Sequence, residues 1–72
     1  MSLTLSVNGE ERILNPAPNP ASIDTVIRAL SQNPALVVVE HNGTIVPRSR
    51  WTAQEVKNGD QLEIVTIVGG GS

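Results

Sequence analysis

The 72-residue sequence contains no cysteine, no tyrosine and no phenylalanine, and it has a single tryptophan and a single histidine. Without cysteine the chain cannot form a disulfide, a thiolate metal site or a cysteine nucleophile. Positive charge is also scarce. The net charge is −2, whereas a nucleic-acid-binding surface needs a basic face. We therefore expect no nucleic-acid partner.

Long apolar runs are absent as well. No run approaches the roughly 20 residues that span a bilayer. The first residues, MSLTLSVNGEE, lack the positive charge and the continuous apolar stretch of a signal peptide. We expect a cytoplasmic protein with no membrane partner.

The residues that usually carry catalysis are few and scattered. His41 and the seven carboxylates form no group in the sequence, which offers no nucleophile–base pair, no metal-ligand spacing and no phosphate-binding loop. His41 itself is expected at a strand end beside a turn, with no second metal ligand nearby. The sequence thus predicts no enzyme, no metal site and no bound cofactor.

The N-terminal part of the sequence predicts a β-hairpin. Apolar and polar residues alternate over residues 3–7, as in a strand with one buried face. Asn8-Gly9 suits a tight turn with positive φ angles, and a second strand follows over residues 11–14. Residues 15–21, NPAPNPA, are predicted to be a loop because their prolines fix φ and remove backbone donors.

One amphipathic helix is predicted over residues 22–32. Ser22 is a favourable N-cap, and Asp24 places negative charge in the first turn. Apolar residues fall at the i, i+3, i+4 and i+7 positions of one helical face. These residues are Ile23, Val26, Ile27 and Leu30. Asn33-Pro34 is expected to end the helix.

The C-terminal half predicts three more strands. ALVVVEHNG indicates a strand that is buried on both faces, or that has one exposed apolar face, and that ends in the Asn42-Gly43 turn. TIV predicts a short strand, PRSRW an irregular segment, and TAQEV one helical turn capped by Thr52. A last strand is predicted over residues 61–68 after the turn at KNGD. Its buried face is expected to hold Leu62, Ile64, Thr66 and Val68.

This order of elements predicts an α+β fold, the ubiquitin-like β-grasp, with a mixed four- to five-stranded sheet packed on one main helix. One sheet face must cover the single apolar stripe of the helix. If the first and last strands are neighbours, they run parallel and the helix is part of the crossover. We expect one domain over residues 1–68 and a flexible glycine-rich tail over residues 69–72.

The tail follows a strand of core quality directly. Because glycine has no Cβ, Gly69, Gly70 and Gly71 can pass through a narrow slot in a partner protein. A carboxylate at the end of such a tail is unhindered for attack on a nucleotide phosphate. The protein would then carry the reacting group while the partner supplies the chemistry. The alternative is a flexible linker or an incidental terminus.

Two stretches of the sequence resemble the ThiS family, the sulfur carriers of thiamine thiazole biosynthesis. NGTIVPRSRW resembles the family's N-x-x-I-V-P-R-x-x-W stretch, and NGDQLEIVTIVGGG resembles its G-D-x-[LI]-x-[IL] pattern with a terminal G-G. The first stretch is supplied by Asn42, Ile45, Val46, Pro47, Arg48 and Trp51. The second is supplied by Gly59, Asp60, Leu62, Ile64, Gly70 and Gly71.

The resemblance implies a reaction and two partners. In the ThiS family an E1-like, ThiF-type adenylyltransferase uses ATP to adenylate the carboxylate of the last glycine. Sulfur then replaces AMP to give a thiocarboxylate, and a ThiG-type thiazole synthase takes the sulfur. By this resemblance Gly71 is the acceptor, and Gly69 and Gly70 are threaded into the partner. Ser72 departs from the family pattern, because Gly71 has a free carboxylate only once Ser72 is removed. Three alternatives stay open: a protease trims Ser72, Ser72 is itself the terminus, or Ser72 is not native.

Other functions stay open on the same fold. The chain could be a MoaD-like carrier for molybdopterin, a ubiquitin-like modifier, or a non-catalytic β-grasp interaction module with an inert tail. The VPRSRW segment favours the thiamine pathway.

The outer face of the last strand is predicted to carry Glu63, Val65 and Ile67. Exposed apolar residues in this place indicate a surface on which partners dock. The alternative is that a loop or the segment 44–57 covers them.

Three further side chains are expected to be structural. Trp51 is expected to pack in the core rather than to anchor a partner. Arg48 and Arg50 are expected to be solvated or paired with nearby carboxylates.

Overall fold

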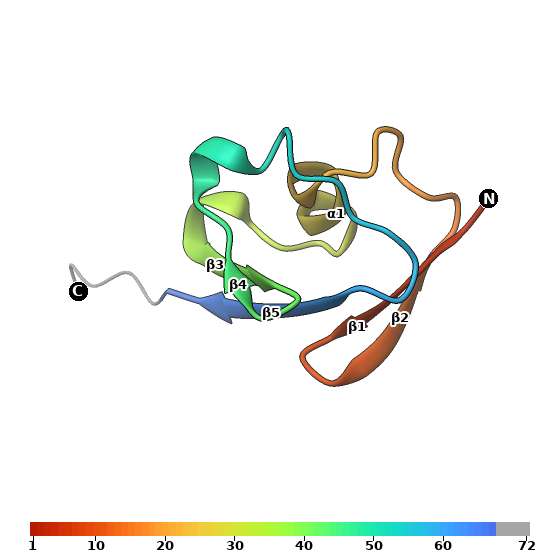
Figure 1. Ribbon diagram of the computed structural model, residues 1–72, viewed down its shortest axis with the longest axis horizontal. Coiled ribbons are helices and arrows are strands. Elements are labelled where there is room, and N and C mark those ends of the chain that lie inside the picture. Colours follow the sequence, from red (N-terminus) through yellow and green to blue (C-terminus); the bar gives the residue numbers. More distant parts are fainter. Residues whose placement is uncertain (68–72) are drawn as a thin grey trace.

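A five-stranded sheet covers one side of a single α-helix in the computed structural model, which describes residues 1–67 (Figure 1). The strands are β1 (Leu3–Val7), β2 (Glu10–Leu14), β3 (Val37–His41), β4 (Thr44–Ile45) and β5 (Gln61–Thr66). The helix is α1 (Ile23–Ala29), and two 3₁₀ helices are η1 (Pro34–Leu36) and η2 (Arg48–Arg50). Within the described residues, no helix is long and apolar enough to cross a membrane.

The strand order β2-β1-β5-β3-β4 places the last strand in the middle of the sheet. β5 runs parallel to β1 and antiparallel to β3, and the other pairs are antiparallel. The prediction of a β-grasp fold with parallel first and last strands is therefore confirmed.

The core lies between the inner face of the sheet and α1. Leu3, Leu5 and Val7 are buried on β1, as their alternation predicts, and Val26 and Ile27 of α1 are fully buried against the sheet. The rest of the core comes from the other strands, the ends of the helix and the loop before β5. Its further members are Ile23, Leu30, Val37, Val39, Val46, Trp51, Val56, Leu62 and Ile64.

Helix α1 begins where the sequence predicts but ends earlier. Ser22 is the N-cap and exchanges hydrogen bonds with Thr25 in a capping box. The helix ends at Ala29 because Ser31 adopts a left-handed φ of 64°. The Ser31 amide bonds to the Arg28 carbonyl and the Gln32 amide to the Ile27 carbonyl, which is the Schellman pattern. Serine is an uncommon residue at that position, so the sequence carried little signal for it.

Two short segments also differ from their predictions. The start of the predicted third strand is η1 instead, capped by the Asn33 side chain, which accepts a hydrogen bond from the Ala35 amide at 3.0 Å. Residues 48–50 form η2 rather than an irregular segment.

The helical turn predicted after Thr52 is wrong. Residues 51–56 instead run alongside the start of α1. The amides of Ile23 and Asp24 donate to the carbonyls of Gln54 and Trp51, and the Val56 amide donates to Ala21. The carbonyls of this loop therefore accept hydrogen bonds from the free amides at the helix N-terminus. Carbonyls used in this way are not available for the hydrogen bonds of a helical turn within the loop.

Strand β5 is shorter than predicted. Leu62 and Ile64 are buried as expected, but Thr66 is exposed and ends the strand. The Ile67 amide still bonds to the Leu36 carbonyl. Val68 lies outside the described residues, as does the predicted tail over residues 69–72.

The three Asn-Gly turns do more than reverse the chain. Asn8 and Asn42 adopt positive φ angles of 52°, as their turns require. Their side chains also bind β5, because Asn42 Oδ1 accepts from the Gln61 amide at 2.8 Å and Asn8 Oδ1 from the Ile64 amide at 2.7 Å.

Asn58, in the third turn, ties the entry of β5 to β1. Its Oδ1 accepts a hydrogen bond from the Thr4 amide at 2.8 Å, and the Gly59 amide donates to the Thr4 carbonyl. Side chains and amides of all three turns thus fix the position of β5.

The Asn8 side chain continues the hydrogen bonding between β1 and β5 beyond the last paired residues. This role generates a stability prediction. The β1 ladder with β5 ends at the pair Val7–Leu62, and Asn8 Nδ2 and Oδ1 then bind both the carbonyl and the amide of the buried Ile64. In Asn8→Gly the backbone conformation is retained, but the carbonyl and the amide of Ile64 lose their hydrogen bonds to the Asn8 side chain. We expect the free energy of unfolding to fall by about 1–3 kcal/mol in urea denaturation.

Asn8→Asp is the matched control, because aspartate keeps the acceptor and tolerates positive φ but lacks the Nδ2 donor. It should be intermediate in stability. Wild-type stability in Asn8→Gly would contradict this role for the side chain.

Candidate functional site

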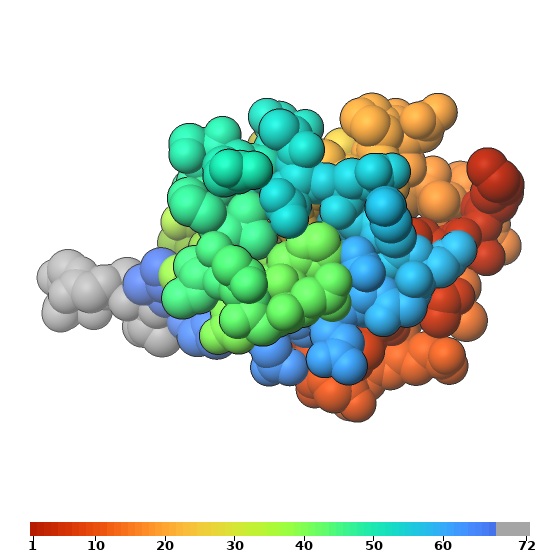
Figure 2. Space-filling model, in the orientation of Figure 1, coloured from red at the N-terminus to blue at the C-terminus, as the bar shows by residue number. Residues whose placement is uncertain are grey.

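The candidate site is the end of β5 together with the sheet face beside it. β5 leaves the sheet at Thr66, and the described chain stops at Ile67. In Figure 2 this end of β5, in blue, lies at one end of the molecule beyond the green segments. The predicted acceptor Gly71 and the threaded residues Gly69 and Gly70 lie outside the described residues, so their roles stay predictions.

The predicted docking residues are exposed on the outer face of the sheet. Val65 is 62% exposed and Ile67 is 50% exposed, and Glu63 is exposed on the same strand. The alternative that the segment 44–57 covers them is therefore wrong. Their use as a docking surface remains a prediction.

The strand register adds three residues that sequence reasoning missed. Val38 lies opposite Val65, and Glu40 lies opposite Glu63 in the antiparallel β3–β5 pair. Ile45 of β4 lies opposite Glu40 on its other side and is 61% exposed. The alternation in VVVEH, with Val37 and Val39 buried, could have placed Val38 and Glu40 outside. We call Val38, Glu40, Ile45, Glu63, Val65 and Ile67 the open-face patch.

A partly buried polar cluster lies at the opposite end of β5. His41 Nε2 and Asp60 Oδ2 are 2.7 Å apart, and His41 Nδ1 is 3.1 Å from Gln54 Nε2. The Asp60 carboxylate also accepts from the Lys57 amide at 2.9 Å. The cluster therefore ties β3, the loop 51–60 and the entry of β5 together. The sequence could not pair His41 with Asp60, which is 19 positions away.

The charged form of Asp60 is favoured by this arrangement. Desolvation by burial acts to raise the pKa of Asp60, but the hydrogen bonds from His41, the Lys57 amide and Asn42 outweigh it, with a smaller contribution from the charge of His41. The net effect lowers the pKa of Asp60 below its ordinary value of 3.8. Within residues 1–67, no three His, Asp or Glu side chains are grouped closely enough to hold a metal ion.

The residues of the PRSRW segment have structural contacts. Trp51 is buried, and its Nε1 donates to the Val46 carbonyl at 2.9 Å, which confirms that it packs in the core. The guanidinium carbon of Arg48 lies 5.3 Å from the centroid of the Trp51 ring, a cation–π distance. Arg48 and Arg50 are exposed, and neither forms an ion pair within the described part of the chain.

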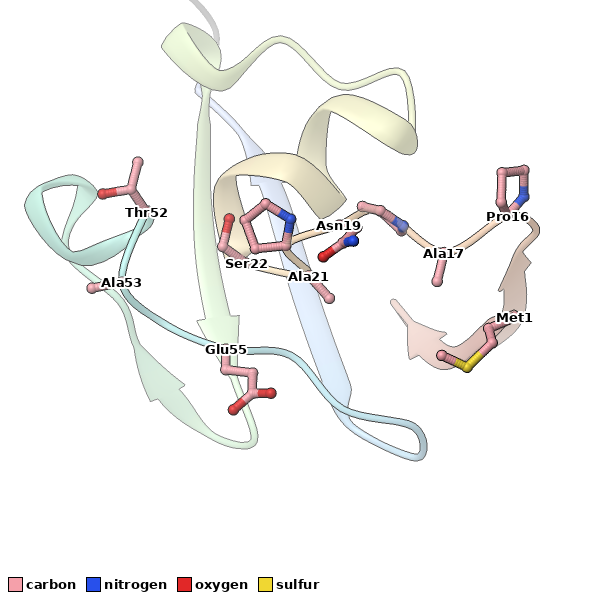
Figure 3. A pocket seen from close by; sticks show the side chains of 11 residues that line it. Met1, Pro16, Ala17, Asn19, Ala21, Ser22, Thr52, Ala53 and Glu55 are labelled. Carbon is pink, nitrogen blue, oxygen red and sulfur yellow. The ribbon is translucent and has the colours of Figure 1, made fainter.

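The proline-rich loop borders a shallow groove of about 640 Å³. Figure 3 shows Met1, Pro16 and Ala17 on one side of the groove and Thr52 and Ala53 on the other. Apart from the chain N-terminus, its one titratable lining group is Glu55.

The pKa of Asp60 generates a pH-dependent prediction. Because the pKa is lower in the folded state, the ionised carboxylate stabilises the fold above its unfolded pKa, and this contribution disappears as pH falls through the folded pKa. We expect Asp60→Asn to lower the free energy of unfolding at pH 7 by about 1–3 kcal/mol. The deficit relative to wild type should shrink as the pH falls below 3.8, the ordinary pKa of the carboxyl, as urea denaturation at several pH values can measure.

Glu11→Gln is the control for Asp60→Asn, because Glu11 is exposed and makes no side-chain hydrogen bond among the described residues. Glu11→Gln should change the free energy of unfolding little at each of these pH values. A deficit of Asp60→Asn that does not change with pH would contradict the assignment.

Comparisons with known proteins agree with this geometry. The ThiS family model matches residues 5–71. The crystal structure of the thiamine biosynthesis protein ThiS from Geobacter metallireducens superposes with a TM-score of 0.79 and 31% identity, over 96% of this chain and 100% of that chain. The uncharacterized protein ycf40 of Trieres chinensis is 34% identical over 68 residues, which are 94% of this chain and 89% of that protein.

A longer relative also matches. A thiazole synthase of Paramagnetospirillum magneticum is 37% identical over 70 residues, which are 97% of this chain, and the chain spans 21% of the length of that protein. The family model covers nearly all of the sequence, and the structural match covers 96% of it. The chain belongs to the ThiS family.

Proposed function

We propose that this chain is a sulfur carrier for thiazole formation in thiamine biosynthesis. Its reacting group is the carboxylate that Gly71 gains when the Gly71–Ser72 peptide bond is hydrolysed. An E1-like, ThiF-type enzyme adenylates this carboxylate with ATP, and it then becomes a thiocarboxylate. The observation that carries the proposal is the central position of β5, which continues directly towards the glycine tail while the open-face patch lies beside it.

The folded domain supplies no catalytic group to this reaction. A carboxylate oxygen of Gly71 attacks the α-phosphate of ATP and displaces pyrophosphate, which leaves an acyl adenylate. A sulfur nucleophile held by the partner then displaces AMP. The catalytic groups belong to the partner, and the chain contributes an end without side chains that fits a narrow active site.

The folded domain positions the start of the tail. β5 has strand neighbours on both sides, and its entry is fixed by Asn58 and Asp60. A tail that starts from a rigid strand loses less conformational freedom on entering a partner than one that starts from a loose segment. The core of this fold therefore serves to present the tail.

The second partner in this proposal is a ThiG-type thiazole synthase. Support comes from the Paramagnetospirillum magneticum relative, because a protein named thiazole synthase matches 97% of this chain. A molybdopterin carrier or a protein modifier would use the same fold with other partners.

A direct test uses the chain ending at Gly71, so that its carboxylate is free. With ATP and the ThiF-type enzyme of the same organism, we expect ATP–pyrophosphate exchange that depends on the chain. With a sulfur donor, we expect a product heavier by the mass difference between sulfur and oxygen.

The control is a chain ending at Val68, which keeps the domain but lacks the acceptor. It should fold, as circular dichroism can verify, and support no exchange. Absence of exchange with the chain ending at Gly71, or equal exchange with both chains, would contradict the proposed function.

A further inference from the structure

Two glutamates lie opposite each other in the strand register on the outer face of the sheet. Glu40 of β3 and Glu63 of β5 are directly opposite in an antiparallel pair, so their side chains leave the same face. That face is the outer one, because Val39 and Leu62, next to them on the two strands, are buried. Neither glutamate forms an ion pair with another of the described residues.

This pairing opposes the stability of the free protein. Like charges directly opposite across a strand pair are destabilising. A lysine or arginine at either position would turn the repulsion into attraction without touching the core. The arrangement therefore lowers the stability of the free protein, and proteins retain such destabilising features where function requires them.

The surroundings of the pair indicate what it meets. Ile45 flanks Glu40 on the neighbouring strand, and the pair Val38–Val65 forms the adjacent row. A protein that covers these exposed apolar side chains also removes water from the two carboxylates. Burying unpaired carboxylates is expensive, so the covering surface must bring a positive charge.

We propose that the open-face patch docks a protein surface that inserts an arginine between Glu40 and Glu63 and covers Val38, Ile45 and Val65 with apolar side chains. A guanidinium suits this place because its planar fork of donors can bind two carboxylates at once. The occupant is the ThiG-type thiazole synthase, because a segment similar to 97% of this chain is part of a Paramagnetospirillum magneticum protein named thiazole synthase. In this choice the inference rests on the proposed function.

A second copy of this chain is a poor occupant. In a two-fold symmetric dimer the same patch meets itself, which brings four carboxylates together without a cation. The patch also lies beside the end of β5, so its occupant stands close to the start of the tail.

The test measures affinity and stability in the same variants. Dissociation constants for the thiazole synthase of the same organism are determined by calorimetry at low and moderate salt. For Glu40→Gln/Glu63→Gln we expect roughly tenfold weaker binding or more and a smaller dependence on salt. Its thermal midpoint should equal or exceed that of wild type, because the repulsion is gone.

Glu63→Arg sharpens the test. It creates an opposite-charge pair with Glu40, so it should raise the thermal midpoint and weaken binding further. Glu11→Gln is the matched control. Glu11 lies on the same face at the other edge of the sheet, and its substitution removes one carboxylate charge as each glutamine substitution in the patch does. It should bind as wild type does.

Three results would overturn the inference. They are unchanged binding by Glu40→Gln/Glu63→Gln, an equal loss in Glu11→Gln, and no binding of wild type to the synthase. Adenylation of the chain ending at Gly71 is measured separately with the ThiF-type enzyme. If adenylation is intact, unchanged binding by the glutamate variants rejects only this inference, whereas no binding of wild type also rejects the ThiG-type partner. Failure of adenylation rejects the reaction on which the proposed function depends.

Discussion

The pairing of β5 between β1 and β3 is the interaction on which the rest of this structure depends. The last strand of the chain occupies the centre of the sheet, and side chains from two Asn-Gly turns bind its backbone directly. Its inner residues Leu62 and Ile64 are buried in the core. Unfolding of β5 would therefore divide the sheet in two, so the segment that leads to the tail is also among the most constrained.

The two faces of the sheet differ in burial and in the side chains that they carry. The inner face and α1 supply the buried apolar surface of a small domain, in which little surface is available for stability. The outer face leaves Val65 and Ile45 exposed and sets Glu40 against Glu63. Stability alone explains neither feature, whereas both are expected of a surface that meets a partner.

Local patterns predicted most of this fold, and what they missed has two sources, uncommon local conformations and contacts between distant residues. The alternation over residues 3–7 and the Ser22 cap were clear because each depends on neighbours in sequence. The helix end was missed because Ser31 rather than glycine adopts the left-handed conformation. The pairing of His41 with Asp60 and the position of Glu40 opposite Glu63 depend on register, which composition and periodicity do not encode. The exposed Glu63, Val65 and Ile67 followed from period-two alternation alone.

The central claim is that a main-chain carboxylate at Gly71 is the group that reacts. The most direct measurement is the intact mass of the protein isolated from its own organism during growth without thiamine. The account predicts a species that ends at Gly71, part of it heavier by the exchange of one oxygen for sulfur. A population that retains Ser72 throughout and carries no added sulfur would contradict the account.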